Sequence, residues 1–194
     1  NPDGSMWRAK AYSVCSPPSE RSFIELGFKI YGPFTQRAAT LAAGDLVELA
    51  GPYGVFTLDK TPADFSVAFL AGGIGITPFL SMVREAVVQK DSRRYSLLYA
   101  NVTTEDIAFF PEILTLSDEN PNFSVTFFVE HGALPPLPAI SEVGRVSPET
   151  LKKYCGNFSK TDYLMCGPPP FMDAMQKCLL EHGVPKERIR KENF

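Results

Sequence analysis

Residues 67–78 read VAFLAGGIGITP, and the interpretation of the whole chain starts from them. The apolar run Val67–Ala71 is typical of a buried strand, and Pro78 suits the first turn of a helix, where its missing N–H costs nothing. Between them stand three glycines, Gly72, Gly73 and Gly75. Glycine lets a backbone approach a phosphate closely, and a helix N-terminus attracts anions. The stretch therefore predicts a nucleotide site, although a tight turn that merely needs glycine would explain the same residues.

No charged residue occurs from Phe65 to Val83, so this region could be mistaken for a membrane span. However, its glycines and Pro78 fall in the middle, and a break there would leave backbone amides unsatisfied in lipid. A buried strand, a glycine loop and a helix start account for the residues better. We therefore expect no membrane span in this chain.

After Asp59, apolar runs alternate with segments of helical pattern. Strands are expected at Val67–Ala71, Tyr95–Ala100, Ser124–Val129 and Asp162–Met165. Helices are expected at Pro78–Gln89, Thr104–Leu116, Pro148–Tyr154 and Pro170–His182, with Gly183 as the C-terminal cap. This alternation predicts an α/β fold with a doubly wound parallel sheet covered on both faces. Because Asp59–Asp64 forms a natural junction, we expect this domain over residues 61–194.

A second loop follows the last expected strand and reads Cys166-Gly167-Pro168-Pro169-Pro170. Ligands of open parallel sheets bind at the carboxyl ends of the strands. The thiol of Cys166 and the glycine loop would then border one cleft. The alternative for Cys166 is a small buried hydrophobic side chain, which is what most free cysteines are.

Residues 1–60 have a β-rich pattern. Strands are expected at Tyr12–Cys15, Phe23–Tyr31 and Leu46–Leu49, and a short helix at Thr35–Ala43. Lys10–Ser13 brings a cation, an aromatic ring and a hydroxyl close together. Gly32–Thr35 starts the expected helix and could hold an anion. Each cluster also has a plain structural explanation, because Tyr12 would fit a core and Gly32-Pro33 a turn.

Composition and charge exclude several classes of protein. The chain has 194 residues, enough for one large domain or two small ones, and its net charge of −3 argues against a general nucleic-acid binder. The four cysteines, Cys15, Cys155, Cys166 and Cys178, form no C-x-x-C pair, and only two histidines occur. This spacing fits neither a zinc nor an iron–sulfur site, so we expect no metal. We interpret the thiols as reduced and the location as cytoplasmic.

The order of these motifs resembles the ferredoxin–NADP reductase-like flavoprotein family over essentially the whole chain. The NADH–cytochrome b5 reductase and oxygenase-reductase branches are the most similar. The residues that carry this likeness are Leu98–Asn101 with Thr104–Ile107, the loop Cys166–Pro170 and the terminal Phe194. The resemblance implies a flavoprotein oxidoreductase in which FAD accepts a hydride from NADH or NADPH.

The resemblance also implies roles for single residues. Tyr12 would lie against the flavin ring, Ser13 would hydrogen-bond its redox-active nitrogen, and Gly32 and Thr35 would hold its pyrophosphate. Toward the nicotinamide cofactor, the implied residues are Gly72, Gly73, Gly75, Thr77, Cys166, Gly167 and Pro168. Thr77 and Cys166 would border the site of hydride transfer. Phe194 would approach the flavin face.

Two departures from the family pattern stand out. Lys10 replaces the arginine that the family has two residues before the flavin tyrosine; a lysine meets a phosphate as a point charge without a bidentate fork. Arg8, nearby in the sequence, is the alternative cation for this role. Residues 1–60 also hold only about half of the family's six-stranded flavin-binding barrel. We therefore expect a partial antiparallel β-barrel here and further strands upstream of Asn1.

The expected activity is electron transfer from NAD(P)H through FAD to a separate acceptor protein or a small molecule. NADH is favoured, because Glu105 and Asp106 would repel the 2′-phosphate of NADPH, and Arg145 is the sole arginine or lysine between Asn101 and Glu149. A pocket of Thr103, Thr104 and Lys177 is the counter-interpretation. Two rival functions remain: a non-catalytic nucleotide-binding or electron-transfer subunit with an incomplete flavin site, and an NAD(P)H:flavin reductase that releases reduced flavin.

Overall fold

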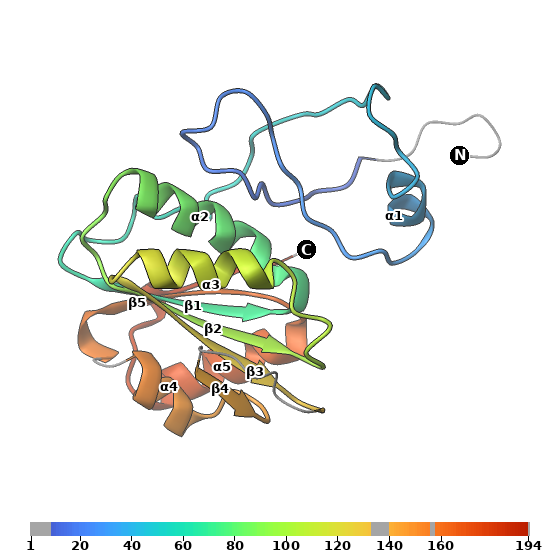
Figure 1. The fold of residues 1–194 in the computed structure, drawn as a ribbon. Helices are drawn as coiled ribbons and strands as arrows, with labels where there is room; N and C mark the ends of the chain where they lie inside the picture. Colours follow the sequence, from blue (N-terminus) through green and yellow to red (C-terminus); the bar gives the residue numbers. More distant parts are fainter. Residues whose placement is uncertain (1–8, 133–139, 156–157, 194) are drawn as a thin grey trace.

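A parallel β-sheet organises the chain from Ser66 onward in the computed structural model, which describes residues 9–132, 140–155 and 158–193 (Figure 1). Its strands are β1 Ser66–Gly72, β2 Tyr95–Asn101, β3 Phe123–Val129, β4 Ile140–Val143, β5 Thr161–Cys166 and β6 Ile189–Glu192. They lie in the order β4-β3-β2-β1-β5-β6, and every pair is parallel. The parallel sheet that the alternating pattern predicts is confirmed.

Helices cover both faces of this sheet (Figure 1). One face carries α2 Thr77–Val88 and α3 Phe110–Glu119, and the other carries α4 Pro148–Cys155 and α5 Pro169–Glu181. Alternation along β1 divides the core: Phe69 packs with α2 and α3, whereas Ala68 and Leu70 pack with α4 and α5. Burial on both faces explains why β1 is an unbroken apolar run. The doubly wound arrangement expected from the sequence is therefore present.

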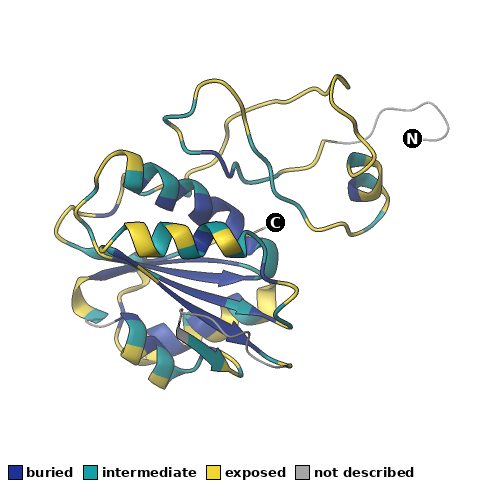
Figure 2. Cartoon of the chain, in the orientation of Figure 1, coloured by how far each residue is buried: buried dark blue, intermediate teal, exposed yellow. Residues whose placement is uncertain are grey.

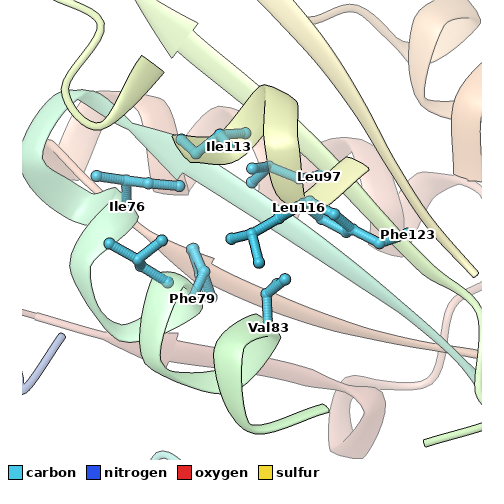
Figure 3. Close-up of a pocket in the computed structure, with 8 residues that line it drawn as sticks. Ile76, Phe79, Val83, Leu97, Ile113, Leu116 and Phe123 are labelled. Carbon is cyan, nitrogen blue, oxygen red and sulfur yellow. The ribbon is translucent and has the colours of Figure 1, made fainter. Parts of the chain in front are cut away.

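The core beneath α2 and α3 is close-packed. A gap of about 10 Å³ lies between Phe79 and Val83 of α2, Ile113 and Leu116 of α3, and Leu97 of β2 (Figure 3). A space of that size barely admits one water molecule, and its apolar lining offers water no hydrogen bond. The gap is a packing void, so a ligand must bind elsewhere.

Residues 9–65 form an extended, largely exposed segment beside α2 (Figures 1 and 2). It contains the short helix α1 Pro33–Ala38 and one isolated antiparallel bridge, between Val14 and Leu26. The three strands expected at Tyr12–Cys15, Phe23–Tyr31 and Leu46–Leu49 are wrong for the described residues, and so is the partial antiparallel β-barrel that they were expected to form. A strand needs a neighbouring ladder for its amides and carbonyls, and Leu46 is 99% exposed.

Other boundaries also differ from the expectations. The helix expected at Thr104–Leu116 begins six residues later, because 103–107 form hydrogen-bonded turns closed by Asp106 and Phe109 has a positive φ before α3. The helix expected at Thr35–Ala43 is shorter and starts at Pro33. Gly183 follows the C-cap residue His182 of α5 and adopts φ +77°, the left-handed conformation common at that position. Among the described residues, no helix is both long and apolar enough to cross a bilayer.

Candidate functional site

The path of the chain through the sheet locates a crevice. From β1 the chain proceeds through β2, β3 and β4 on one side, and then crosses to β5 and β6 on the other. Strands β1 and β5 are therefore neighbours whose following loops turn to opposite faces, and ligands of open α/β sheets bind at such a point. The loop after β1 is Gly73–Ile76, a 3₁₀ turn that leads directly into α2. The loop after β5 is Gly167–Pro168.

These two loops touch each other through glycines. A side-chain Cβ on Gly75 would lie 2.2 Å from the carbonyl oxygen of Cys166, and one on Gly167 would lie 2.9 Å from the Cα of Gly72. A Cβ on Gly72 would lie 2.9 Å from Cδ of Pro168. No side chain fits in any of the three places without moving backbone or ring atoms. Close packing of the two loops thus requires Gly72, Gly75 and Gly167, with or without a ligand.

Gly73 differs from the other glycines of the loop. Its φ is +52°, a left-handed conformation that favours glycine, and a Cβ built there would meet no atom within 4 Å. The space beside Gly73 is therefore open, at the entrance to α2. Thr77 begins that helix and is buried, with its hydroxyl donating to the carbonyl oxygen of Ile74 at 3.2 Å.

Cys166 ends β5 opposite Ala71 of β1, and its side chain is fully buried. Burial raises the pKa of its thiol to about 12, and the charge of Glu192 adds to this effect. The thiol is therefore neutral at physiological pH. It can border a ligand as a small apolar group, and it cannot act as a thiolate nucleophile.

The residues that the resemblance assigns to the flavin lie in the N-terminal segment. Tyr12 is partly buried, with its ring 5.9 Å from that of Phe28 and 6.1 Å from that of Phe34 between centroids. Ser13 is also partly buried, whereas Lys10 is exposed. Tyr12 thereby connects the segment before the Val14 bridge to α1.

Gly32 and Thr35 lie at the start of α1. The backbone N–H of Tyr31 donates to the hydroxyl of Thr35 at 2.6 Å, and that hydroxyl lies 3.3 Å from the carbonyl oxygen of Gly32. The side chain of Thr35 thus closes the turn that α1 begins with. Phe194 lies outside the described residues.

One contact joins the two groups of residues. A Cβ on Gly27 would lie 2.8 Å from the Cγ2 of Thr77 and 3.2 Å from the Sγ of Cys15, so the N-terminal segment packs directly on the start of α2. The structure therefore brings the segment with Tyr12 and Ser13 to the same helix as the glycine loop. No contact between Tyr12 and Cys166 is seen among the described residues.

Asn101 is a candidate that the sequence analysis did not single out. It ends β2, next to Gly72 at the end of β1, where Ala100 pairs with Gly72. Asn101 is 5% exposed, and neither amide atom of its side chain has a hydrogen bond of good geometry among the described residues, although the amide lies close enough to the Tyr99 hydroxyl to oppose the rise that burial causes in the pKa of Tyr99. A buried amide without partners is costly unless something else satisfies it. An asparagine after an apolar strand carries no distinctive pattern, so sequence alone could not have identified it.

Charged groups at the same edge of the sheet are paired. Lys29 of the N-terminal segment lies 3.4 Å from Asp106, which also accepts hydrogen bonds from the backbone and hydroxyl of Thr103. Arg145 forms two hydrogen bonds with Glu130, at 3.0 and 3.1 Å, where β3 has just ended. Arg145 and Asp106 could be singled out from the sequence, but their partners, Glu130 and Lys29, lie 15 and 77 residues away along the chain and could not.

A known protein family matches the part of the chain that forms this edge of the sheet. Residues 69–177, more than half of the chain, match the oxidoreductase NAD-binding domain. The chain belongs to the oxidoreductase NAD-binding domain family. The matched region begins within β1 and so includes both glycine loops of the crevice.

Within this family, the chain is similar to curated NADH-cytochrome b5 reductases. It is 32% identical over 183 residues to NADH-cytochrome b5 reductase 1 of Meyerozyma guilliermondii, which covers 92% of this chain and 63% of the relative. It is also 32% identical over 184 residues to NADH-cytochrome b5 reductase 1 of Dictyostelium discoideum, with 93% and 63% covered. The chain thus spans 63% of the length of these relatives.

Solved structures of similar fold agree with this placement. The cytochrome b5 reductase domain of Ulva prolifera nitrate reductase superposes with a TM-score of 0.81 at 26% identity, covering 94% of this chain and 76% of that one. A ferredoxin NADP+ reductase from Neisseria gonorrhoeae gives a TM-score of 0.77 at 22% identity, with 95% and 79% covered, which is a likeness of fold. The resemblance to the ferredoxin–NADP reductase-like family, near the NADH–cytochrome b5 reductases, is confirmed.

Proposed function

We propose that this protein is a flavin-dependent oxidoreductase that passes electrons from NADH through FAD to a separate acceptor. The observation that carries the proposal is the crevice between β1 and β5, where the open space at Gly73 meets the N-terminus of α2. The names of the relatives, NADH-cytochrome b5 reductases, support the same activity. By that analogy the acceptor is a cytochrome b5-type haem protein, with a small molecule as the alternative.

Two observations support binding of the nucleotide in this crevice. Gly73 exposes backbone to open space, and Asn101 holds a buried amide without a hydrogen bond of good geometry among the described residues at the next strand end. A dinucleotide pyrophosphate would lie against Gly73 and the amides that open α2, because a helix N-terminus attracts anions. Gly72, Gly75 and Gly167 would keep the two loops packed so that this surface is preformed. Thr77 and Cys166 would border the reactive nicotinamide ring.

The flavin would lie against the N-terminal segment, where Tyr12 would face the ring, Ser13 would hydrogen-bond it, and Lys10, Gly32 and Thr35 would meet its pyrophosphate. Flavin supplies hydride acceptance and onward electron transfer when it is bound. The task of the chain is to stack the two rings and to exclude water. We therefore propose two domains, with residues 1–60 binding the flavin and residues 61–194 binding the nucleotide. The four free, buried cysteines support a reducing compartment such as the cytoplasm.

The preference for NADH rests on the paired charges beside β2 and β3. A 2′-phosphate needs a free arginine or lysine. The guanidinium of Arg145 is already engaged by Glu130, and the amine of Lys29 lies beside Asp106. Both carboxylates would repel a phosphate dianion. Lys177 of α5 lies 3.9 Å from Glu181, which weakens the counter-interpretation that it joins Thr103 and Thr104 in a phosphate pocket.

The specificity test compares kcat/KM for NADH and NADPH in the wild type and in Asp106→Asn. We expect NADH to be preferred, and we expect the variant to gain activity with NADPH because Lys29 loses its carboxylate partner. The matched control is Asp118→Asn on the exposed side of α3, which should leave the ratio unchanged. An NADPH value equal to the NADH value in the wild type would contradict the assignment.

A non-catalytic nucleotide-binding subunit is the alternative that one observation favours. Apolar side chains between residues 23 and 55 are exposed, including Tyr53 at 86%, so the flavin segment has little cover of its own. The absorption spectrum of the purified protein separates the two functions. A bound flavin spectrum that bleaches when NADH is added supports the oxidoreductase. Colourless protein that binds NADH but reduces no added flavin would overturn it, and flavin lost on gel filtration would indicate a flavin reductase.

A further inference from the structure

One face of α2 fastens the N-terminal segment to the nucleotide half of the molecule. The hydroxyl of Ser81 donates to the carbonyl oxygen of Ser16 at 2.8 Å. One turn further, a carboxylate oxygen of Glu85 accepts the backbone N–H of Ser19, also at 2.8 Å. Between these two contacts stands Arg84.

The guanidinium of Arg84 joins three parts of the chain. It donates two parallel hydrogen bonds to Glu112 of α3, at 2.6 and 2.8 Å. Its remaining nitrogen donates to the carbonyl oxygen of Cys15 at 2.8 Å and to the carboxylate of Glu25 at 2.5 Å. The Arg84 side chain is only 16% exposed, so these bonds are partly shielded from water. Such charge-assisted, bidentate bonds are directional as well as strong.

Cys15 and Glu25 stand opposite each other in the N-terminal segment. The N–H of Cys15 donates to the carbonyl oxygen of Glu25 at 2.8 Å, and the N–H of Glu25 donates to the hydroxyl of Ser16 at 3.1 Å. The adjacent residues Val14 and Leu26 form the antiparallel bridge. Arg84 therefore holds both arms of this pair at once.

The same paired arms carry the residues assigned to the flavin. Tyr12 and Ser13 directly precede Val14 on one arm, and Phe28, whose ring lies 5.9 Å from that of Tyr12, follows Leu26 on the other. The N-terminal end of α2 is Thr77, which directly follows the glycine loop. A single helix thus sets where the flavin arms lie and where the nicotinamide crevice lies.

We propose that Arg84 is a positioning residue that fixes the flavin arms relative to the nicotinamide site through its bond to Glu25. This inference rests on the proposed function. Hydride transfer depends on distance and alignment between two rings, and a misplacement of about 1 Å can cost roughly a hundredfold in rate. The bonds of Arg84 to Glu112 join α2 to α3 inside the nucleotide half, so they stabilise that half without setting the ring geometry.

The test compares Glu25→Gln with the matched variant Glu112→Gln in the flavin-loaded protein. Each substitution removes one carboxylate charge from Arg84, but only the first loosens the flavin arms. We expect Glu25→Gln to lower the limiting rate of flavin reduction at saturating NADH by roughly tenfold, with the Kd for NADH unchanged. We expect Glu112→Gln to lower the melting temperature and to keep the limiting rate within about twofold.

Hydrogen–deuterium exchange gives a readout that does not depend on turnover. In Glu25→Gln the amides of residues 12–16 and 25–28 should exchange faster, and in Glu112→Gln they should not. Arg84→Lys should also free the amides of residues 12–16 and 25–28, because a single amine cannot hold Glu112, Cys15 and Glu25 at the same time. A wild-type limiting rate and wild-type protection in Glu25→Gln would overturn the inference. A wild type that holds no flavin would instead overturn the proposed function, and the exchange experiment would still decide the role of Arg84.

Discussion

The thiol of Cys166 is fully buried at the end of β5, and burial raises its pKa to about 12. Because the neutral thiol is the stable form below that pH, Cys166 has no charge to contribute between pH 6 and 9. Its expected role at the crevice is therefore to fill space beside the nicotinamide ring. The pH dependence of the reaction rate can distinguish a space-filling role of this side chain from a role of its ionised thiol.

We predict that Cys166→Ala slows flavin reduction and leaves the affinity for NADH nearly unchanged, because the contact matters mainly when the rings are aligned. The limiting rate of the wild type should show no thiol titration from pH 6 to 9. Stopped-flow measurements of both proteins over that range provide the test. A wild-type rate in Cys166→Ala would return this residue to the class of ordinary buried cysteines.

Asn101, unlike Cys166, buries a polar group, and its side-chain amide has no hydrogen bond of good geometry among the described residues. Two unsatisfied amide atoms destabilise the free protein by about 1–3 kcal/mol each if nothing else binds them. We predict that Asn101→Leu raises the melting temperature of the unliganded protein and reduces the stabilisation that NADH adds. Thermal unfolding with and without NADH measures both effects. An equal NADH-dependent shift in variant and wild type would exclude a role in binding.

At the scale of elements, the strands that the sequence revealed are the buried ones. Strands β1, β2, β3 and β5 are apolar because other elements cover them, and each of their ends could be predicted to within one residue. Strands β4 and β6 escaped detection because they occupy the two edges of the sheet. Their residues, ISEV and IRKE, carry charges of the kind that protect an edge from pairing with another chain.

The site was predictable to the same extent. The glycine loops are local, so their residues and their meeting at one edge followed from the pattern of strands and turns. The partners of Arg84, however, lie 28, 59 and 69 residues away along the chain. The Lys29–Asp106 pair spans 77 residues. Single-sequence patterns describe neighbours along one element, and contacts at such separations depend on tertiary packing.

A buried ion pair joins the segment before β1 to β5 and β6. Asp162 of β5 accepts a hydrogen bond from the hydroxyl of Thr61 at 2.8 Å and lies 3.2 Å from the guanidinium of Arg190 on β6. Arg190 also donates to the carbonyl oxygen of Thr57 at 2.5 Å. The side chains of Asp162 and Arg190 are 7% and 16% exposed. These contacts fix the segment that leads into β1.

We predict that Asp162→Ala lowers the free energy of unfolding by about 3–5 kcal/mol, because it leaves the charge of Arg190 buried without a carboxylate partner. Asp64→Ala removes an exposed partner of Lys160 and should cost less than about 1 kcal/mol. Urea unfolding of the two variants measures the difference. Equal losses in both would show that burial does not govern the strength of the Asp162 pair.

At the scale of the whole molecule, the cysteines share one property. All four are free and buried, and they are spread from the N-terminal segment to α5. Burial raises the pKa of Cys15 to about 11 and that of Cys155 to about 12, and it raises the pKa of Cys178 as well. The folded chain therefore retains thiol protons at a pH where the unfolded chain releases them.

This difference in thiol pKa makes the folded state less stable at alkaline pH. Below the ordinary thiol pKa both states are protonated, so the thiols leave stability independent of pH. Above about pH 9 the unfolded thiols ionise first, and each can lower the free energy of unfolding by about 1.4 kcal/mol per pH unit until the folded pKa is reached. We predict that the urea midpoint under reducing conditions falls steadily between pH 9 and 11. Cys155→Ala costs stability at pH 7 by leaving a small cavity, but it should flatten the alkaline slope by one thiol's share. An unchanged slope in that variant would mean that Cys155 ionises as readily in the folded chain as in the unfolded one.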